Sequence, residues 1–194
     1  MTNKLKASVS DADLLINLSK VNRLDILESL FDEIIVPEFI LRREVLRIYK
    51  DAYPLISRKI DDKSSLFQHK DYEKDYALKL AAEPVVAEYF KWVGRGESEC
   101  AGYARALEIA IIVSDNTKDF DIMEEEFIML THVDILVLLV KKELMSLEEA
   151  AQIYDSINEM KTGKYKFSAT FQEQIPKRLK RIKDNGWGPY LGLK

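Results

Sequence analysis

The feature that most constrains the fold is an alternation of short apolar runs with longer helical patterns. Four runs contain Val or Ile and are too short for helices; they lie at residues 6–10, 33–37, 110–113 and 127–130. Between them, apolar residues recur at helical spacing. Short strands that alternate with helices predict an α/β fold, in which helices cover both faces of a short central parallel sheet.

Several of the helical segments have recognisable ends. The first has a break near Asn22, and another begins near Pro37, because proline is tolerated in a first helical turn. Ser146 and Glu149 predict a capping box for the helix that follows them. The expected helices lie at residues 13–30, 37–48, 97–109, 131–142 and 146–160.

Residues 50–93 are charged and aromatic and carry no strand signal. We predict one or two helices there, with Pro54 and Pro84 as breakers. The chain has 194 residues, which is enough for one domain and hardly enough for two. We therefore predict one domain over residues 1–160, with 50–93 as a helical addition within it, and a tail over 161–194 that packs on or beside the domain.

The composition excludes several kinds of site. Cys100 is the one cysteine, so an internal disulfide is impossible, and with two histidines the chain lacks the ligands of a structural zinc site. Residues 1–10 have no signal-peptide layout, and the longest apolar run, at 135–140, is far too short to cross a bilayer. We therefore expect a cytoplasmic protein with no membrane partner.

Charge is distributed unevenly along the chain. The net charge is −4, but residues 161–194 hold nine Lys/Arg and two acids, which leaves 20 Lys/Arg and 31 acids in the rest. Within this basic tail, residues 175–183 form an amphipathic helical pattern with cations between apolar positions. An acidic body with a basic tail indicates an anionic partner, such as nucleic acid.

Acidic side chains follow the predicted strands. Asp11 comes directly after the first strand, and Asp115, with Asn116 and Asp119, follows the third. In doubly wound sheets the active crevice lies beyond the carboxyl ends of the strands. Carboxylates crowded there repel one another unless a cation neutralises them, and Mg²⁺ and Mn²⁺ prefer oxygen ligands. Each acid alone is more often a helix cap or turn residue, so their joint placement carries the metal hypothesis.

Four pieces of sequence, in order, resemble a PIN domain over roughly residues 7–160. They are Val9-Ser10-Asp11, the Val36-Pro37 step into a helix with Glu44, Gly96-Glu97, and Ser114-Asp115-Asn116 with Asp119 beyond it. The chain is similar to the toxin branch of that family, the virulence-associated ribonuclease toxins. The resemblance implies a three-layer α/β/α fold and an endoribonuclease that hydrolyses RNA with Mg²⁺ or Mn²⁺. It also implies RNA, an antitoxin protein and a second copy of the chain as partners.

The resemblance assigns roles to particular residues. The implied catalytic set is Asp11, Glu44, Glu97 and Asp115, and the implied metal ligands are Asp11, Glu97, Asp115, Asn116 and Asp119. Two choices stay open, between Glu97 and Glu99 and between Asp115 and Asp119. The second acid of the family usually lies six residues after the proline; Arg43 holds that position here, and Glu44 follows it.

Cationic residues are candidates for contacts with nucleic acid: Arg43, Lys118, Lys177, Arg178, Lys180 and Arg181. The basic tail has an alternative role, in which its apolar face docks on the body and its cations stay in water. Trp187 and Tyr190 have two corresponding alternatives, stacking on bases or packing on the domain. His132, at a helix start outside the motif segments, is expected to be a cap or surface residue.

Other functions stay open from the sequence. One is a catalytically silent PIN-like module that binds nucleic acid or protein, since Glu44 is displaced and residues 50–93 are added. Another is a nuclease for DNA, because nothing in the sequence separates ribose from deoxyribose. A phosphatase that forms a phospho-aspartate is less favoured, although Asp11 and Asp13 have the required spacing.

Overall fold

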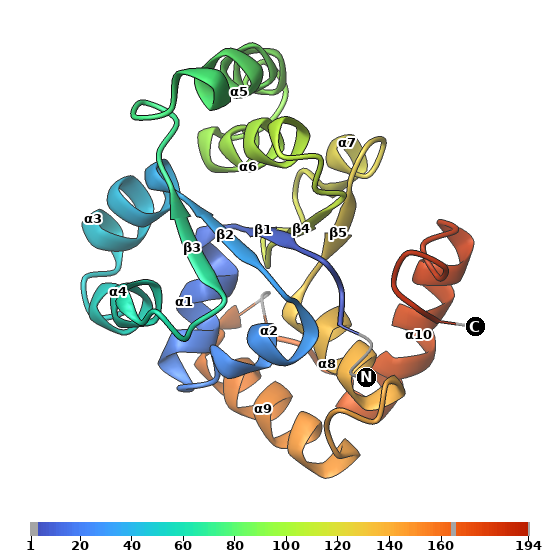
Figure 1. Ribbon diagram of the computed structural model, residues 1–194. Coiled ribbons are helices and arrows are strands. Elements are labelled where there is room, and N and C mark those ends of the chain that lie inside the picture. The colour runs from blue at the N-terminus through green and yellow to red at the C-terminus, as the bar shows by residue number, and fades with distance from the viewer. Residues whose placement is uncertain (1–3, 164–165, 194) are drawn as a thin grey trace.

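The computed structural model describes residues 4–163 and 166–193. Its centre is a five-stranded parallel sheet in the order β3-β2-β1-β4-β5 (Figure 1). The strands are β1 (Ser8–Ser10), β2 (Ile34–Pro37), β3 (Phe67–Lys70), β4 (Ile111–Val113) and β5 (Ile128–Leu130). Val9 of the central strand pairs with Ile35 of β2 and with Ile112 of β4. Every residue of β1, β2, β4 and β5 is buried, which is typical of a parallel sheet covered on both faces.

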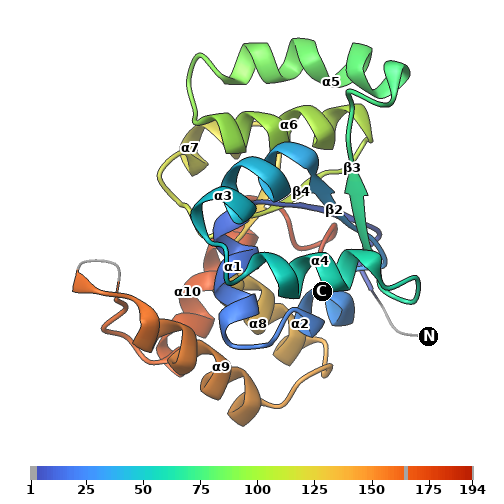
Figure 2. The same cartoon turned by 90° about the vertical axis from the view of Figure 1, so that its left-hand side faces the viewer.

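Helices cover both faces of the sheet, so the predicted three-layer α/β/α fold is confirmed. The helices are α1 (Ala12–Lys20), α2 (Asp25–Leu30), the π-helix η1 (Ile40–Val45), α3 (Leu46–Ile48), α4 (Tyr53–Asp61), α5 (Tyr76–Tyr89), α6 (Arg95–Ala106), α7 (Phe120–Met123), α8 (His132–Lys141), α9 (Leu147–Met160) and α10 (Phe171–Asp184). Helices α5 and α6 lie on one side of the sheet, and α1, α2 and α8 lie on the other (Figures 1 and 2). Helices α9 and α10 pack on α8.

The expectation that residues 50–93 contain no strand is wrong, because β3 lies there. β3 is an edge strand that pairs with β2 alone, and its sequence is Phe-Gln-His-Lys. Only Phe67 is buried, while Gln68 is exposed. An edge strand with one buried side chain leaves no apolar run or alternation in the sequence, and pairing with β2 decides its conformation.

The expectation that Pro84 breaks a helix is also wrong. Pro84 lies inside α5, whereas Pro54 lies in the first turn of α4, where proline is tolerated. Proline within a helix removes one backbone hydrogen bond. Helix α5 packs so closely on α6 that a methyl group at Gly102 would lie 3.0 Å from the Ala82 carbonyl oxygen. We attribute the continuity of α5 through Pro84 to this packing.

Most of the other predicted helix ends agree with the structure. The break near Asn22 is confirmed, since Asn22 has φ of 53° between α1 and α2. Only half of the predicted capping box forms at α9. The Ser146 hydroxyl accepts from the Glu149 N–H, but the Glu149 carboxylate pairs with Arg23 instead of the Ser146 backbone. Complete capping boxes form at α8 and α10, from Thr131 with Asp134 and from Thr170 with Glu173.

The core fills the space between the sheet and its two helical layers. Leu14, Leu15 and Leu18 of α1 are completely buried, and so is Cys100 of α6. Phe171 and Ile182 of α10 are buried with them, so α10 contributes side chains to the same core. Among the described residues, no helix is both long and apolar enough to cross a membrane.

Candidate active site

Asp11 lies at the carboxyl end of β1, directly before α1, but does not cap that helix. Its side chain makes no capping hydrogen bond to α1, although the adjacent Ala12 backbone N–H lowers its pKa. One carboxylate oxygen instead accepts a hydrogen bond from the Ser114 hydroxyl, at 2.8 Å, beside the end of β4. Both residues are buried. The interpretation of Asp11 as a helix cap is therefore wrong, and its carboxylate is held from the neighbouring strand.

Ser114 also connects this carboxylate to the first turn of α6. Its hydroxyl oxygen accepts from the Asn116 N–H at 3.1 Å. The Asn116 side-chain amide in turn donates to Glu97 Oε1 at 2.5 Å. Residues from β1, the loop after β4 and α6 are thus joined by hydrogen bonds, and Glu97 is close enough to Asp11 to influence its ionisation.

Glu44 reaches the same region from the π-helix η1. In a π-helix each N–H bonds the carbonyl five residues back, as Leu46 N–H does to Leu41. One extra residue is therefore accommodated in the turn. This explains the register of the sequence: Arg43, six residues after Pro37, is exposed, and Glu44, seven residues after it, is half-buried next to the other acids. π-Helical turns occur frequently at functional sites.

Gly96, in the first turn of α6, makes room for the Glu44 carboxylate. A methyl group at this glycine would lie 2.6 Å from Glu44 Oε1 and 3.0 Å from Oε2. Real Cβ atoms do not approach other atoms at 2.6 Å, so any side chain here would displace Glu44. The Gly96-Glu97 pair therefore serves two purposes: the glycine admits one acid and the next residue supplies another.

The pKa values of these acids report their crowding. Burial, together with repulsion from the nearby Glu97, raises the pKa of Asp11 to about 7. Burial also raises the pKa of Glu44 to about 8, with added repulsion from Asp11 and Glu97. Carboxyl groups that crowd one another have raised pKa values, and a bound cation would lower these values again.

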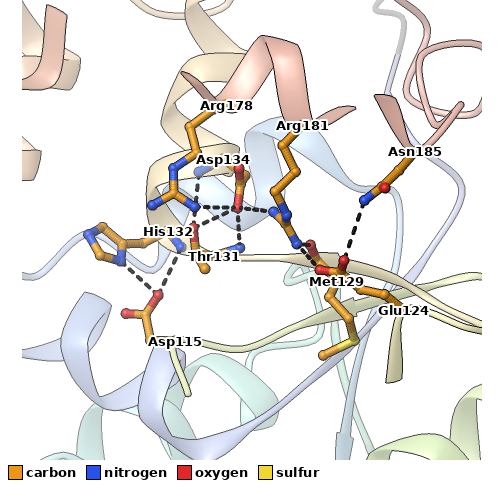
Figure 3. A network of polar contacts seen from close by, with 9 residues as sticks. All are labelled: Asp115, Glu124, Met129, Thr131, His132, Asp134, Arg178, Arg181 and Asn185. Carbon is orange, nitrogen blue, oxygen red and sulfur yellow. Dashed lines mark hydrogen bonds and ion pairs between the residues drawn. The ribbon is translucent and has the colours of Figure 1, made fainter. Parts of the chain in front are cut away.

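Asp115 has a different environment, shown in Figure 3. Its Oδ1 accepts from the His132 backbone N–H at 2.9 Å and lies 2.7 Å from the His132 Nδ1. Its Oδ2 accepts from the Asn17 amide at 2.6 Å. Burial opposes ionisation of Asp115, but the charge and hydrogen bonds of His132 prevail and hold its pKa well below the usual range. These interactions therefore favour the ionised form of Asp115.

The expectation that His132 is a cap or surface residue is wrong. Only 1% of its side chain is exposed, and its ring lies near those of Tyr154 and Phe167. Thr131, the preceding residue, is the helix cap. His132 was missed because a lone histidine has no pattern of its own. Its position just beyond β5, beside the end of β4, was the available signal.

Glu97 and Glu99 have different hydrogen-bond partners, and so do Asp115 and Asp119. Glu99 is 1% exposed, and its Oε1 accepts from Arg95 Nε at 2.8 Å and from the Tyr72 hydroxyl at 3.1 Å, so it lies in a separate ion pair. Glu97 is the one bonded to Asn116 beside Asp11. Asp119 is buried at the start of α7 and makes no capping hydrogen bond with its side chain. Within the described part of the chain its side chain makes no hydrogen bond or ion pair, whereas Asp115 is bonded to Asn17 and His132.

Asp13 is an additional acid at this edge that the candidate set omitted. It is exposed in the first turn of α1. Partial burial raises the pKa of its carboxyl, and repulsion from Asp115 and Glu97 adds to that effect. Asp13 therefore lies between the Asp115 environment and the cluster of Asp11, Glu44 and Glu97.

The candidate cations divide into two groups. Arg178 and Arg181 both pair with the buried Asp134, and Arg181 also bonds Glu124 and the Met129 carbonyl (Figure 3). The other candidates are exposed: Arg43, Lys118, Lys177 and Lys180. The aromatic candidates also divide, since Trp187 is buried against Arg181 and Tyr190 is 71% exposed.

A groove with a volume of about 1180 Å³ opens beside Asp115. Asp13, Asn17, Asp115 and Asn116 line its floor, and residues of α1, the end of α9 and α10 line the rest. The groove therefore gives a large ligand access to Asp13 and Asp115, whereas Asp11, Glu44 and Glu97 are not among the residues that line it.

The donor set suits a hard divalent cation, although it is not a finished metal site. Among residues 4–163 and 166–193, no three side chains of His, Cys, Asp or Glu converge closely enough to form one. Asp11, Glu44 and Glu97 nevertheless offer carboxylate oxygens that repel one another, which is the environment that Mg²⁺ and Mn²⁺ prefer. These three are the residues that would hold the ion, which would replace the protons retained on Asp11 and Glu44.

Comparison with known proteins agrees with this fold. The family model described as DUF3368, a PIN domain, matches residues 7–181. A comparison with curated proteins finds no match. The matched range includes all five strands and every acid described above. PIN domains are generally nucleases, and these nucleases generally use divalent metals. Because the match spans most of the chain, the protein belongs to the PIN-domain family.

Proposed function

We propose that this protein is a metal-dependent endoribonuclease that hydrolyses RNA phosphodiester bonds. The observation that carries the proposal is the cluster of Asp11, Glu44 and Glu97, drawn from three distant segments, with raised pKa values on two of them. The family's general use of divalent metals supports the same conclusion. We propose Mg²⁺ or Mn²⁺ as the ion, since every donor is an oxygen.

The chain's own residues have separable tasks in this proposal. Asp11, Glu44 and Glu97 hold the ion, with Ser114 and Asn116 fixing the orientation of two of these carboxylates. When bound, the ion orients a water, raises its hydroxide fraction and neutralises charge on the phosphoryl oxygens. Asp115, whose ionised form is favoured by His132, accepts hydrogen bonds from Asn17 and His132. It thereby orients these two residues at the groove. No side-chain nucleophile is required.

We further propose that the protein is the toxin of a toxin–antitoxin pair. The support is the resemblance of its four motif segments to the virulence-associated ribonuclease toxins. Expression of the chain alone should then arrest growth of a bacterial host, and expression of Asp11→Asn at the same level should not. Growth arrest by both proteins, or by neither, would contradict the toxin assignment and leave the nuclease proposal to its own test.

Cleavage of a labelled mixed-sequence RNA tests the enzymatic proposal. The intact protein should cut with Mg²⁺ or Mn²⁺ and not in EDTA, and Asp11→Asn should be inactive. Asp32→Asn is the matched control, because Asp32 is exposed at the amino end of β2, on the opposite edge of the sheet. Metal-independent cutting, or full activity in Asp11→Asn, would overturn the proposal.

The same assay decides the remaining residue choices. Glu97→Gln should abolish cleavage, whereas Glu99→Gln, which breaks a pair with Arg95, should act mainly on stability. Asp115→Asn should reduce cleavage more than Asp119→Asn does. A matched single-stranded DNA substrate, cut at an equal rate, would show that the enzyme does not select ribose.

A further inference from the structure

Two lysines line the groove beside Asp115, and both are close enough to Asp13 to lower the pKa of its carboxyl. Lys20 lies in the last turn of α1, and Lys161 lies at the carboxyl end of α9. In the part of the chain that the structure describes, neither forms an ion pair, although Arg178 and Arg181 in the same groove both do. An unpaired cation in a groove is available to an anionic ligand.

Each of these lysines lies over an aromatic ring in the same groove. The Lys161 ammonium is 4.6 Å from the centre of the Phe167 ring, and the Lys20 ammonium is 5.3 Å from that of Tyr49. Lys161 is half-buried, and its desolvation lowers its pKa. Asp115 and Asp13 favour its charged form, whereas Arg178 disfavours it. A phosphate in contact with Lys161 would add a direct ion pair that the described residues do not supply.

The alternative role of Lys161 is structural. A cation at the carboxyl end of a helix interacts favourably with the helix dipole. That role requires no aromatic neighbour, and it does not explain why a second lysine at the end of another helix repeats the arrangement in the same groove. The combination of cations with aromatic faces is the arrangement by which proteins bind single-stranded nucleic acid, through phosphates and stacked bases.

The Phe167 ring already stacks on Tyr154, whereas Tyr49 is 40% exposed. We propose that Lys161, Lys20 and Tyr49 form a binding site for single-stranded RNA in this protein, with the lysines on phosphates and the Tyr49 ring on a base. The inference rests on the proposed nuclease function and names the residues that bind its substrate. Asp13 and Asp115 lie near Lys161, so a strand held there passes the acidic floor of the groove. A duplex fits this site poorly, because its bases are already stacked on one another.

Binding of a fluorescein-labelled, mixed-sequence RNA, followed by anisotropy at several salt concentrations, tests the proposal. Cleavage is prevented in two ways, with EDTA for the intact protein and with Mg²⁺ for the Asp11→Asn protein. Lys161→Gln should weaken binding roughly threefold or more and should reduce the log–log salt slope by about 0.7, the contribution of one phosphate contact to a single strand. Tyr49→Leu should weaken binding about fivefold, with little change in the slope.

Lys63→Gln is the matched control, because Lys63 is an exposed lysine in the loop between α4 and β3, outside the groove. It should leave both affinity and salt slope unchanged. Unchanged far-ultraviolet circular dichroism and thermal unfolding would confirm that Lys161→Gln and Tyr49→Leu are folded. The intact protein and the Asp11→Asn protein should both bind the single strand more tightly than a duplex of the same sequence.

Three outcomes would overturn the inference. They are equal binding by Lys161→Gln and the intact protein, an equal loss in Lys63→Gln, and binding of duplex as tight as that of single strand. Failure of the proposed function is a different result. If Lys161 and Tyr49 govern binding but no RNA is ever cut, the binding site stands and the nuclease proposal falls.

Discussion

Asp11 and Glu44 retain protons that a cation must displace, which makes metal binding dependent on pH. Their carboxyl pKa values are about 7 and about 8. Mn²⁺ affinity, measured by isothermal titration calorimetry, should therefore rise between pH 6 and pH 8, by up to about tenfold per pH unit for each proton displaced. Asp11→Asn should bind weakly with a shallower pH dependence. Affinity that does not change across this range would contradict the crowded-acid interpretation.

The same two carboxyls should destabilise the metal-free protein at alkaline pH. Their folded-state pKa values lie above the unfolded values of 3.8 and 4.5, so the folded protein binds protons more tightly. The free energy of unfolding should therefore rise as pH falls from 8 towards 6, by roughly 2–4 kcal/mol for the two groups together. Urea denaturation in EDTA measures this. Asp11→Asn should be more stable than the intact protein at pH 8, and the difference should shrink at pH 5.

Gly96 has a role that separates stability from activity. Alanine there would meet the flexible end of Glu44 rather than backbone atoms, and it replaces a glycine in a helix. Gly96→Ala should therefore keep the free energy of unfolding within about 1 kcal/mol of the original value. It should still lower metal affinity and cleavage by roughly tenfold or more, because Glu44 is displaced. Calorimetry and the cleavage assay together test this, and full activity would show that Glu44 is not a ligand.

The sequence identified acids by position along the chain but not by the face on which they lie. Asp11 and Asp115 follow strands, so the parallel topology alone placed them at one edge. Glu97 and Glu99 are two residues apart on α6 and therefore point in different directions, one towards Asn116 and one towards Tyr72. The orientation of α6 on the sheet, which is a long-range property, decides between them.

The π-helix η1 compensates for an additional residue. Ile40 and Val45 are both buried although they are five residues apart, a spacing that suits a π turn and not an α turn. Deletion of Arg43, which is exposed, should convert the turn to an α-helix, with the buried pair four residues apart and Glu44 still facing Asp11. The deletion protein should fold and keep metal-dependent cleavage within roughly tenfold.

An insertion at the same place is the control for that deletion. One alanine added after Arg43 should rotate Glu44 away from the cluster and expose part of the apolar face. It should abolish cleavage and destabilise the protein by several kcal/mol, on the order of losing a buried aliphatic side chain. If the deletion is inactive while folded, the π turn itself, and not only its register, is required.

Strands and helices were predictable where buried residues form a continuous apolar run or recur at helical spacing. β1, β2, β4 and β5 lie within the apolar runs, because both faces of those strands are covered. β3 was not predictable, because its pairing with β2 determines it more than its own Phe-Gln-His-Lys sequence does. Pro84 was misread for the same reason: tertiary packing on α6 overrides a local preference.

Two arginines of the basic tail form ion pairs with one buried acid of the domain, Asp134. Asp134 of α8 is fully buried, and its Oδ2 bonds the Thr131 hydroxyl at 2.7 Å and Arg181 Nη1 at 3.1 Å. Arg181 also donates to the Met129 carbonyl at 2.8 Å and lies over the rings of Phe120 and Trp187. These contacts join α10 to the start of α8, where His132 lies, so the position of Asp115 depends on α10 (Figure 3).

Loss of Arg181 should therefore destabilise the molecule as a whole. Arg181→Ala leaves Asp134 buried with only the weaker pair to Arg178, at 3.6 Å, and should lower the free energy of unfolding by roughly 2–4 kcal/mol in urea denaturation. Lys180→Ala, at an exposed neighbour, should change it by less than about 0.5 kcal/mol. The double variant Arg181→Met with Asp134→Leu should recover much of the loss, since it removes the stranded charge. Equal stability of Arg181→Ala and Lys180→Ala would mean that α10 rests on the body through its apolar face alone.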